Sequence, residues 1–99
     1  LEIRAAIIAS DADKILVTHG TDTMVQTGRV LADIPGKTIV ITGAMQPATL
    51  RISDAEFNVG FALAATQTLP PGVYIAMNGE IFDPAKVHKD RSAHRFIRD

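Results

Sequence analysis

A hydroxyl and a carboxylate stand side by side at Thr21 and Asp22, directly after an apolar run that ends in a Gly-containing turn. The run, residues 15–17, is typical of a buried strand, and the residues from Thr23 onward have the spacing of an amphipathic helix. In a parallel α/β sheet such a turn lies at the carboxyl edge of the strands, where ligands bind and the first N–H groups of the helix point. Thr21 and Asp22 are therefore candidates for ligand binding or proton transfer. The alternative is that they only cap the helix.

The elements that must position this pair alternate between helix and strand. Each predicted strand is a short apolar run, which is typical of parallel strands that are buried on both faces. We expect strands at residues 15–18, 38–41 and 73–77, and helices at residues 2–10, 23–32 and 53–67. This alternation predicts parallel strands joined by right-handed crossovers. The loop at residues 42–47 follows the second strand and is expected at the same edge of the sheet as Thr21.

Local signals mark several ends and turns. Ser53 and Glu56 have the capping-box spacing that begins a helix. Gly28 lowers helix propensity by about 1 kcal/mol relative to Ala. That cost is reasonable if the helix must approach the sheet closely. Asn78 and Gly79 are a pair that makes a tight turn after the third strand.

The pattern changes from residue 80 onward. Residues 81–82 and 86–88 flank Asp83-Pro84 and are predicted to form the two short strands of a hairpin. Residues 90–99 are mostly charged, with Phe96 as an anchor. Three longer strands are few for a doubly wound sheet. The predicted fold is therefore α/β, a three-layer Rossmann-like or flavodoxin-like arrangement whose mainly parallel sheet is incomplete at its N-terminal side.

Length and composition limit the possible functions. The chain has 99 residues, 46% of them hydrophobic, which suits one modest domain with a packed core. It contains no cysteine, which excludes disulfides and thiolate chemistry within this piece and agrees with a cytoplasmic location. Its formal net charge is -1 and it has no basic stripe, so we expect no nucleic acid partner. No apolar run is long enough to cross a membrane, and no signal peptide is visible.

Other candidate sites are weaker. His19, His88 and His94 are not spaced for metal binding on one predicted helix face, so we expect no metal site. His19 is better suited to a structural hydrogen bond at the strand end. The Gly20-Thr21 turn at a helix N-terminus could hold a phosphate, although the P-loop and dinucleotide patterns are both missing.

Three segments together resemble the bacterial L-asparaginase/glutaminase family. They read Val-Thr-His-Gly-Thr-Asp-Thr-Met at residues 17–24, Ile-Thr-Gly-Ala-Met-Gln-Pro at residues 41–47, and Ser-Asp-Ala with a later Asn at residues 53–58. Met77-Asn78 and the later Lys89 are similar to the family segment that carries an active-site lysine. The resemblance extends from the first predicted strand to about Lys89. Several ordered segments with the expected spacing are a more specific signal than one short motif.

The resemblance implies an amide hydrolysis site that needs no metal or organic cofactor. Thr21 would be the second-site threonine, which polarises the nucleophile or a water molecule. Asp22 would bind the α-ammonium group of the substrate and pair with Lys89, the active-site lysine. A lysine beside a hydroxyl can exchange a proton with it and so activate a weak nucleophile. Gly20 and Ala44 would offer backbone groups to the substrate amide.

The chain also departs from the family pattern. The family's first threonine lies in a Thr-Gly-Gly-Thr turn, and no such turn occurs here. The segment with the serine that grips the substrate carboxylate is absent as well. Residues 1–99 would thus be the second half of an asparaginase-type N-terminal domain, without the smaller C-terminal domain and inactive alone. Because the chain starts at Leu1 rather than Met, we expect a longer parent protein.

These departures leave an alternative to the amidohydrolase, a non-catalytic domain that binds an amino acid or serves assembly. Asparagine, glutamine and another amide are all candidate substrates. Family members assemble as dimers or tetramers, so the resemblance implies a homo-oligomer, or pairing of the first strand with an N-terminal segment missing here. From its spacing alone, Lys89 is better explained as a solvated lysine in a charged tail. The resemblance instead places its ammonium within about 6 Å of the Thr21 hydroxyl and the Asp22 carboxylate.

Overall fold

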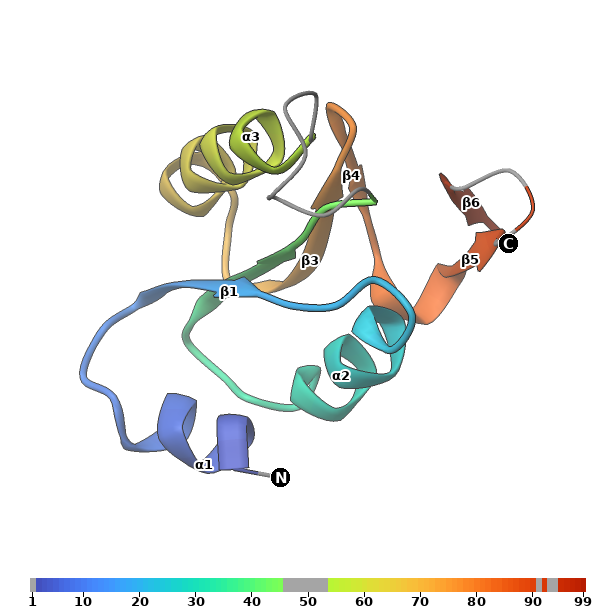
Figure 1. Ribbon diagram of the computed structural model, residues 1–99. Coiled ribbons are helices and arrows are strands. Elements are labelled where there is room, and N and C mark those ends of the chain that lie inside the picture. The colour runs from blue at the N-terminus through green and yellow to red at the C-terminus, as the bar shows by residue number, and fades with distance from the viewer. Residues whose placement is uncertain (1, 46–53, 91, 93–94) are drawn as a thin grey trace.

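Helices and strands alternate through the first three strands, as the sequence predicts (Figure 1). The computed structural model describes residues 2–45, 54–90, 92 and 95–99. The helices are α1 (Glu2–Ala9), α2 (Met24–Leu31), α3 (Ala55–Thr68) and the short 3-10 helix η1 (Pro84–Lys86). The strands are β1 (Lys14–Thr18), β2 (Thr38–Thr42), β3 (Gly72–Met77), β4 (Glu80–Phe82), β5 (Val87–Asp90) and β6 (Arg95–Arg98).

One sheet forms the centre of the fold, with strand order β1-β2-β3-β4. β1, β2 and β3 are parallel, and β4 pairs antiparallel with β3. The register aligns Val17 with Ile41 and Ile41 with Ile75, so the carboxyl ends of the three parallel strands lie at one edge. The predicted α/β class with a mainly parallel sheet is confirmed.

Helices cover both faces of this sheet, which gives the three predicted layers (Figure 1). Successive residues of a strand point to opposite faces, so β2 contributes to two cores. Ile39 and Ile41 join the core under α1 and α2. Val40 joins Ala62 and Ala65 of α3 on the other face. All five residues of β2 are buried, because this central strand lies between helices.

The two crossover connections differ in hand. The steps from β1 to β2 and from β2 to β3 run in the same direction across the sheet, yet α2 and α3 cover opposite faces. Two such connections must have opposite hands, so one of them is left-handed and the prediction of right-handed crossovers throughout is wrong. The first face is already covered by α1 and α2. Residues 43–54 separate β2 from α3 and give the chain enough length to reach the other face.

β1 is an edge strand in the described part of the chain, as expected for a sheet that is incomplete at its N-terminal side. Among the described residues it pairs only with β2. Val17 is buried, Ile15 and Leu16 are partly buried, and Lys14 and Thr18 are exposed. Ile15 packs against the core under α2 and Leu16 against the core under α3, so the predicted burial on both faces is present but partial.

The pairing after β3 also differs from the predicted hairpin. Asn78 and Gly79 form the predicted tight turn, with positive φ angles of 53° and 77°, and the turn pairs β4 back onto β3. β5 pairs with β6 instead. The prediction that residues 81–82 pair with residues 86–88 is thus wrong, since an Asn-Gly turn is a stronger hairpin signal than Asp-Pro. Phe96 is buried as predicted, but it lies in a strand.

Two further observations concern the helices. The predicted capping residue Ser53 lies outside the described residues, and α3 begins after Asp54. Where the structure describes the chain, no helix combines the length and apolar character needed to cross a membrane.

Candidate active site

Lys89 meets both Thr21 and Asp22, although they are far apart in the sequence. Its Nζ donates a hydrogen bond to Thr21 Oγ1 at 2.7 Å and another to Asp22 Oδ1 at 2.6 Å. The Lys89 side chain is 15% exposed and that of Asp22 is 66% exposed. The expected convergence of these three residues is therefore present, and Lys89 is not a solvated lysine in a tail.

The fold explains why these residues meet. Thr21 and Asp22 lie in the turn between β1 and α2, at the carboxyl edge of the sheet. Lys89 lies on β5, opposite Phe96 of β6. Val87 of β5 and Phe96 are both buried in the core under α2, which fixes the strand against the helix. The lysine then reaches across the start of α2.

The turn after β1 and the loop after β2 lie side by side. The backbone N–H of His19 donates to the Thr42 carbonyl at 2.9 Å. A Cβ added at Gly43 would lie 2.2 Å from the carbonyl oxygen of His19, so the two backbones could not approach this closely with any other residue there. Gly20 and Ala44 therefore sit on neighbouring loops at the edge that carries Thr21. Their predicted backbone contacts with a substrate stay a prediction.

His19 has the structural role that the sequence indicates. Its Nδ1 lies 2.7 Å from the Gly20 carbonyl oxygen and its Nε2 lies 2.9 Å from Thr27 Oγ1. A carbonyl oxygen can only accept, so Nδ1 is the protonated nitrogen. His88 pairs with Asp99 at 2.7 Å. In the described part of the chain, no three His, Asp or Glu residues are grouped to hold a metal ion, and His94 lies outside that part.

A buried amide holds the same edge together, and sequence reasoning gave it no role. Asn58 is fully buried. Its Nδ2 donates to the Gly43 carbonyl at 2.9 Å and to Asp54 Oδ2 at 3.0 Å, and its Oδ1 accepts from the Asn78 N–H at 3.0 Å. Asp54 Oδ2 also accepts from the Met45 N–H. The sequence signal for this buried amide is an Asn that follows an Asp by four residues and lies on the apolar face of a predicted helix.

A shallow cavity of about 180 Å³ adjoins the ion pair. It is lined by Asp22, Gln26 and Arg29 on the α2 side and by His88 and Lys89 of β5. The ion pair is therefore reachable from solvent on this side.

Residues 1–96 match the sequence profile of the family described as Asparaginase, N-terminal. The chain belongs to the asparaginase family. The L-asparaginase of Thermococcus kodakarensis is 38% identical to this asparaginase-family chain over 93 residues, which are 90% of this chain and 28% of that protein. The glutaminase-asparaginase of Pseudomonas aeruginosa is 37% identical over 78 residues, 74% of this chain and 22% of that protein.

Two further comparisons agree. A subunit of the glutamyl-tRNA(Gln) amidotransferase of Methanococcus vannielii is 36% identical over 101 residues, covering 93% of this chain and 23% of that protein. A solved structure of the thermostable L-asparaginase from Thermococcus kodakarensis superposes with a TM-score of 0.89 at 32% identity. The match covers 98% of this chain and 32% of that one. This asparaginase-family chain thus spans less than a third of each of these relatives.

Proposed function

We propose that this chain supplies one half of an amidohydrolase site that converts a side-chain amide, of asparagine or glutamine, to the acid and ammonia. The observation that carries the proposal is the pair of short contacts from Lys89 to Thr21 and Asp22, at 2.7 and 2.6 Å. Membership of the asparaginase family supports the reaction class.

The geometry suits a proton relay at a hydroxyl. The Lys89 nitrogen donates to the oxygen of Thr21, so the hydroxyl hydrogen can point to a water or a second nucleophile. An ammonium cannot accept a proton, so the relay requires Lys89 first to give one to the Asp22 carboxylate at 2.6 Å. The amine then accepts the Thr21 proton as Thr21 accepts one from the nucleophile, which activates a hydroxyl that is weak alone. The chemistry needs no metal or organic cofactor.

Asp22 is suited to hold the substrate's ammonium group. Its carboxylate is 66% exposed, which lets a charged ligand reach it, and Lys89 fixes its orientation at 2.6 Å. Carboxylate-to-ammonium hydrogen bonds are roughly twice as strong as neutral ones. Gly20 and Ala44, on the two adjoining loops, would present backbone groups to the amide.

The acyl-accepting hydroxyl would come from outside these 99 residues. The chain contains no Thr-Gly-Gly-Thr turn, and it covers 28% of the Thermococcus kodakarensis relative. We therefore assign Thr21, Asp22 and Lys89 to the proton-relay and ammonium-binding half of a site completed by another segment.

The test is an amidase assay on the full gene product, meaning these residues with whatever sequence is encoded on either side. We expect release of ammonia from L-asparagine or L-glutamine. Asp22→Asn should mainly raise KM, by roughly 10- to 100-fold, because a charged hydrogen bond of about 1.5–3 kcal/mol to the ammonium is weakened. Thr21→Val should mainly lower kcat. Absence of amidase activity on a panel of side-chain amides in the folded wild type would overturn the proposal in favour of a non-catalytic binding domain.

A second candidate is the amidase part of a glutamyl-tRNA(Gln) amidotransferase. It is favoured by 36% identity to the amidotransferase subunit of Methanococcus vannielii over 93% of this chain, close to the 38% found for the L-asparaginase. The two candidates differ in substrate. Glutamine turnover that greatly exceeds asparagine turnover, and that increases with added Glu-tRNA(Gln) and a partner protein, would select the second.

Among the described residues, the edge of β1 that faces away from β2 has no partner strand, and we propose it as the place for a further strand, from the N-terminal part of the same protein or from a partner chain. Its apolar residues Ile15 and Leu16 are only partly buried. An unpaired apolar edge templates pairing with another strand. We expect the isolated 99 residues to self-associate in size-exclusion chromatography with light scattering, and Leu16→Lys to reduce this association. A cooperatively unfolding monomer would contradict the expectation.

A further inference from the structure

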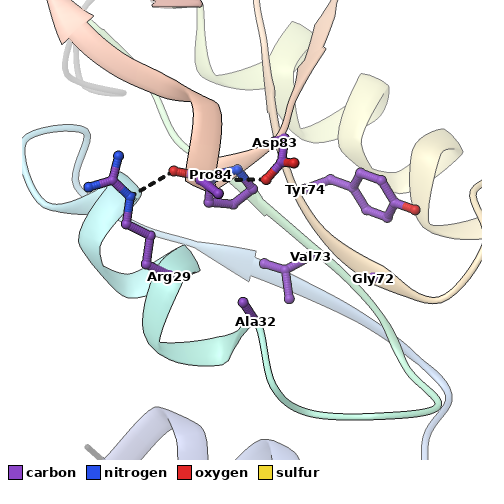
Figure 2. A pocket seen from close by; sticks show the side chains of 8 residues that line it. Arg29, Ala32, Gly72, Val73, Tyr74, Asp83 and Pro84 are labelled. Atoms are coloured by element: carbon purple, nitrogen blue, oxygen red, sulfur yellow. Dashed lines mark hydrogen bonds between the residues drawn. The ribbon is translucent and has the colours of Figure 1, made fainter. Parts of the chain in front are cut away.

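Arg29 joins α2 to the segment that carries Lys89. It lies in the last turn of α2. Its Nε donates to the Pro84 carbonyl at 2.9 Å, a bond drawn in Figure 2, and its Nη2 donates to the Val87 carbonyl at 3.4 Å. The two acceptors lie at the start of η1 and at the start of β5, so one side chain spans the connection between them. Lys89 follows two residues later.

Apolar packing also holds α2 against η1, at Gly28 and Pro84. A Cβ added at Gly28 would lie 2.8 Å from both Cβ and Cγ of Pro84. Pro84 and Val87 are both buried. The Gly28 backbone thus sets how near α2 can come to η1. The close approach was predicted to be to the sheet, and it is to Pro84 instead. Ile41 of the sheet lies farther away, at 3.5 Å from the added Cβ.

α2 is the common support of both halves of the candidate site. Thr21 and Asp22 lie just before its first residue, and Arg29 holds the Lys89 segment at its last turn. We propose that Arg29 is a positioning residue for Lys89: its guanidinium fixes the η1–β5 segment on α2 so that the lysine ammonium contacts Thr21 and Asp22. The expected effect of Arg29 on catalysis rests on the proposed function. Its effect on the position of Lys89 can be measured without any catalytic activity.

Arginine suits this task for a geometric reason. Its guanidinium is planar and presents several donors in a fixed fork, so one side chain can bond two carbonyl groups of neighbouring backbone. A lysine ammonium is a point charge on a flexible stem and lacks this fixed fork. The 2.7 and 2.6 Å contacts of Lys89 leave little tolerance, since a shift of about 1 Å at a catalytic group can cost as much as 100-fold in rate.

Kinetics of the full gene product give the first test. We expect Arg29→Met to lower kcat by roughly 10- to 100-fold with little change in KM. Arg29→Lys should recover part of the loss. The matched control is Arg4→Met, which removes an arginine that pairs with Asp33 on the same side of the sheet. It should leave both kinetic constants unchanged. Equal kcat values for Arg29→Met and Arg4→Met, with wild-type amidase active, would overturn the inference.

Chemical modification of Lys89 gives a test that needs no activity. In the wild type the 15% exposed, hydrogen-bonded amine should be methylated slowly by formaldehyde and borohydride, as followed by mass spectrometry of the Lys89 peptide. Arg29→Met should raise the rate severalfold, toward that of Thr21→Val. Gly28→Ala should raise it as well, because the added methyl pushes Pro84 away without changing charge. Both variants must keep the wild-type circular dichroism and a cooperative unfolding transition.

The two tests separate the possible failures. Faster methylation in both variants with an inactive wild type would support the positioning role while rejecting the amidase. An active wild type whose Lys89 methylation is the same in Arg29→Met, Gly28→Ala and Arg4→Met would reject the positioning role while leaving the amidase intact.

Discussion

Lys89→Met is expected to lower kcat for amide hydrolysis by the full gene product by roughly 1,000-fold, within the range that positioned proton transfer contributes. The lysine nitrogen is the atom that contacts both Thr21 Oγ1 and Asp22 Oδ1, at 2.7 and 2.6 Å. Its removal therefore ends the proposed relay and also removes the ion pair between Lys89 and Asp22. Methionine keeps the apolar length of the side chain but has no donor.

The fold should survive this substitution. Asp22 is 66% exposed, so the carboxylate left behind can be solvated by water and no buried charge results. We expect the urea midpoint of Lys89→Met to match that of the wild type closely. Lys86→Met is the matched control, because Lys86 is an exposed lysine of η1 only three residues away. Activity of Lys89→Met within a few-fold of the Lys86→Met value would remove Lys89 from the reaction.

The sequence predicts best where the signal is local. The apolar runs at residues 38–41 and 73–77 correspond to β2 and β3, and the turn with Thr21 and Asp22 lies at the predicted edge of the sheet. The asparaginase resemblance, carried by several such segments, is confirmed by the match to residues 1–96. Each of these features depends on a few consecutive residues, so local patterns in a single sequence are enough to predict it.

Features that depend on distant neighbours were predicted less well. An apolar run does not reveal how completely a strand is covered, and Ile15 and Leu16 of β1 are only partly buried. The hand of a crossover depends on which face of the sheet is already covered by helices, and α1 and α2 together cover the face opposite α3. Short runs such as residues 81–82 can pair with either neighbour, and the Asn78-Gly79 turn decides for β3.

The candidate site shows the same division. Thr21 and Asp22 are adjacent and could be chosen from their own turn. Lys89 lies 68 positions from Thr21 and was found only through the resemblance, because no local pattern distinguishes it from other lysines in a charged segment. Arg29 acts through backbone carbonyls, which every residue has, so no side-chain motif indicates its partners.

Asn58→Ala is expected to lower the free energy of unfolding by about 3 kcal/mol or more, a large share of the roughly 5–15 kcal/mol that stabilises a domain. The fully buried amide connects three parts of the fold: the end of β2 through the Gly43 carbonyl, the start of α3 through Asp54, and the β3–β4 turn through the Asn78 N–H. Alanine would leave the Gly43 carbonyl and the Asn78 N–H without this partner. Each buried polar group left unsatisfied costs about 1–3 kcal/mol.

Urea unfolding of the full gene product would measure this loss, and a second substitution identifies its cause. Asn58→Asp keeps an oxygen that can accept from Asn78, but it removes the donor to Gly43 and brings a second carboxylate beside Asp54. We expect it to destabilise at least as much as Asn58→Ala, because the buried second carboxylate adds a desolvation cost and is repelled by Asp54. Gln67→Ala, which removes an exposed amide from the same helix, is the control and should change stability by at most about 0.5 kcal/mol. If Asn58→Ala unfolded at the same urea concentration as Gln67→Ala, the amide network would not hold this edge of the sheet. The two loops that carry Gly43 and Asn78 would then be held by side-chain packing instead. Met24 is the side chain nearest to Gly43, and Phe57 is the side chain nearest to Gly79.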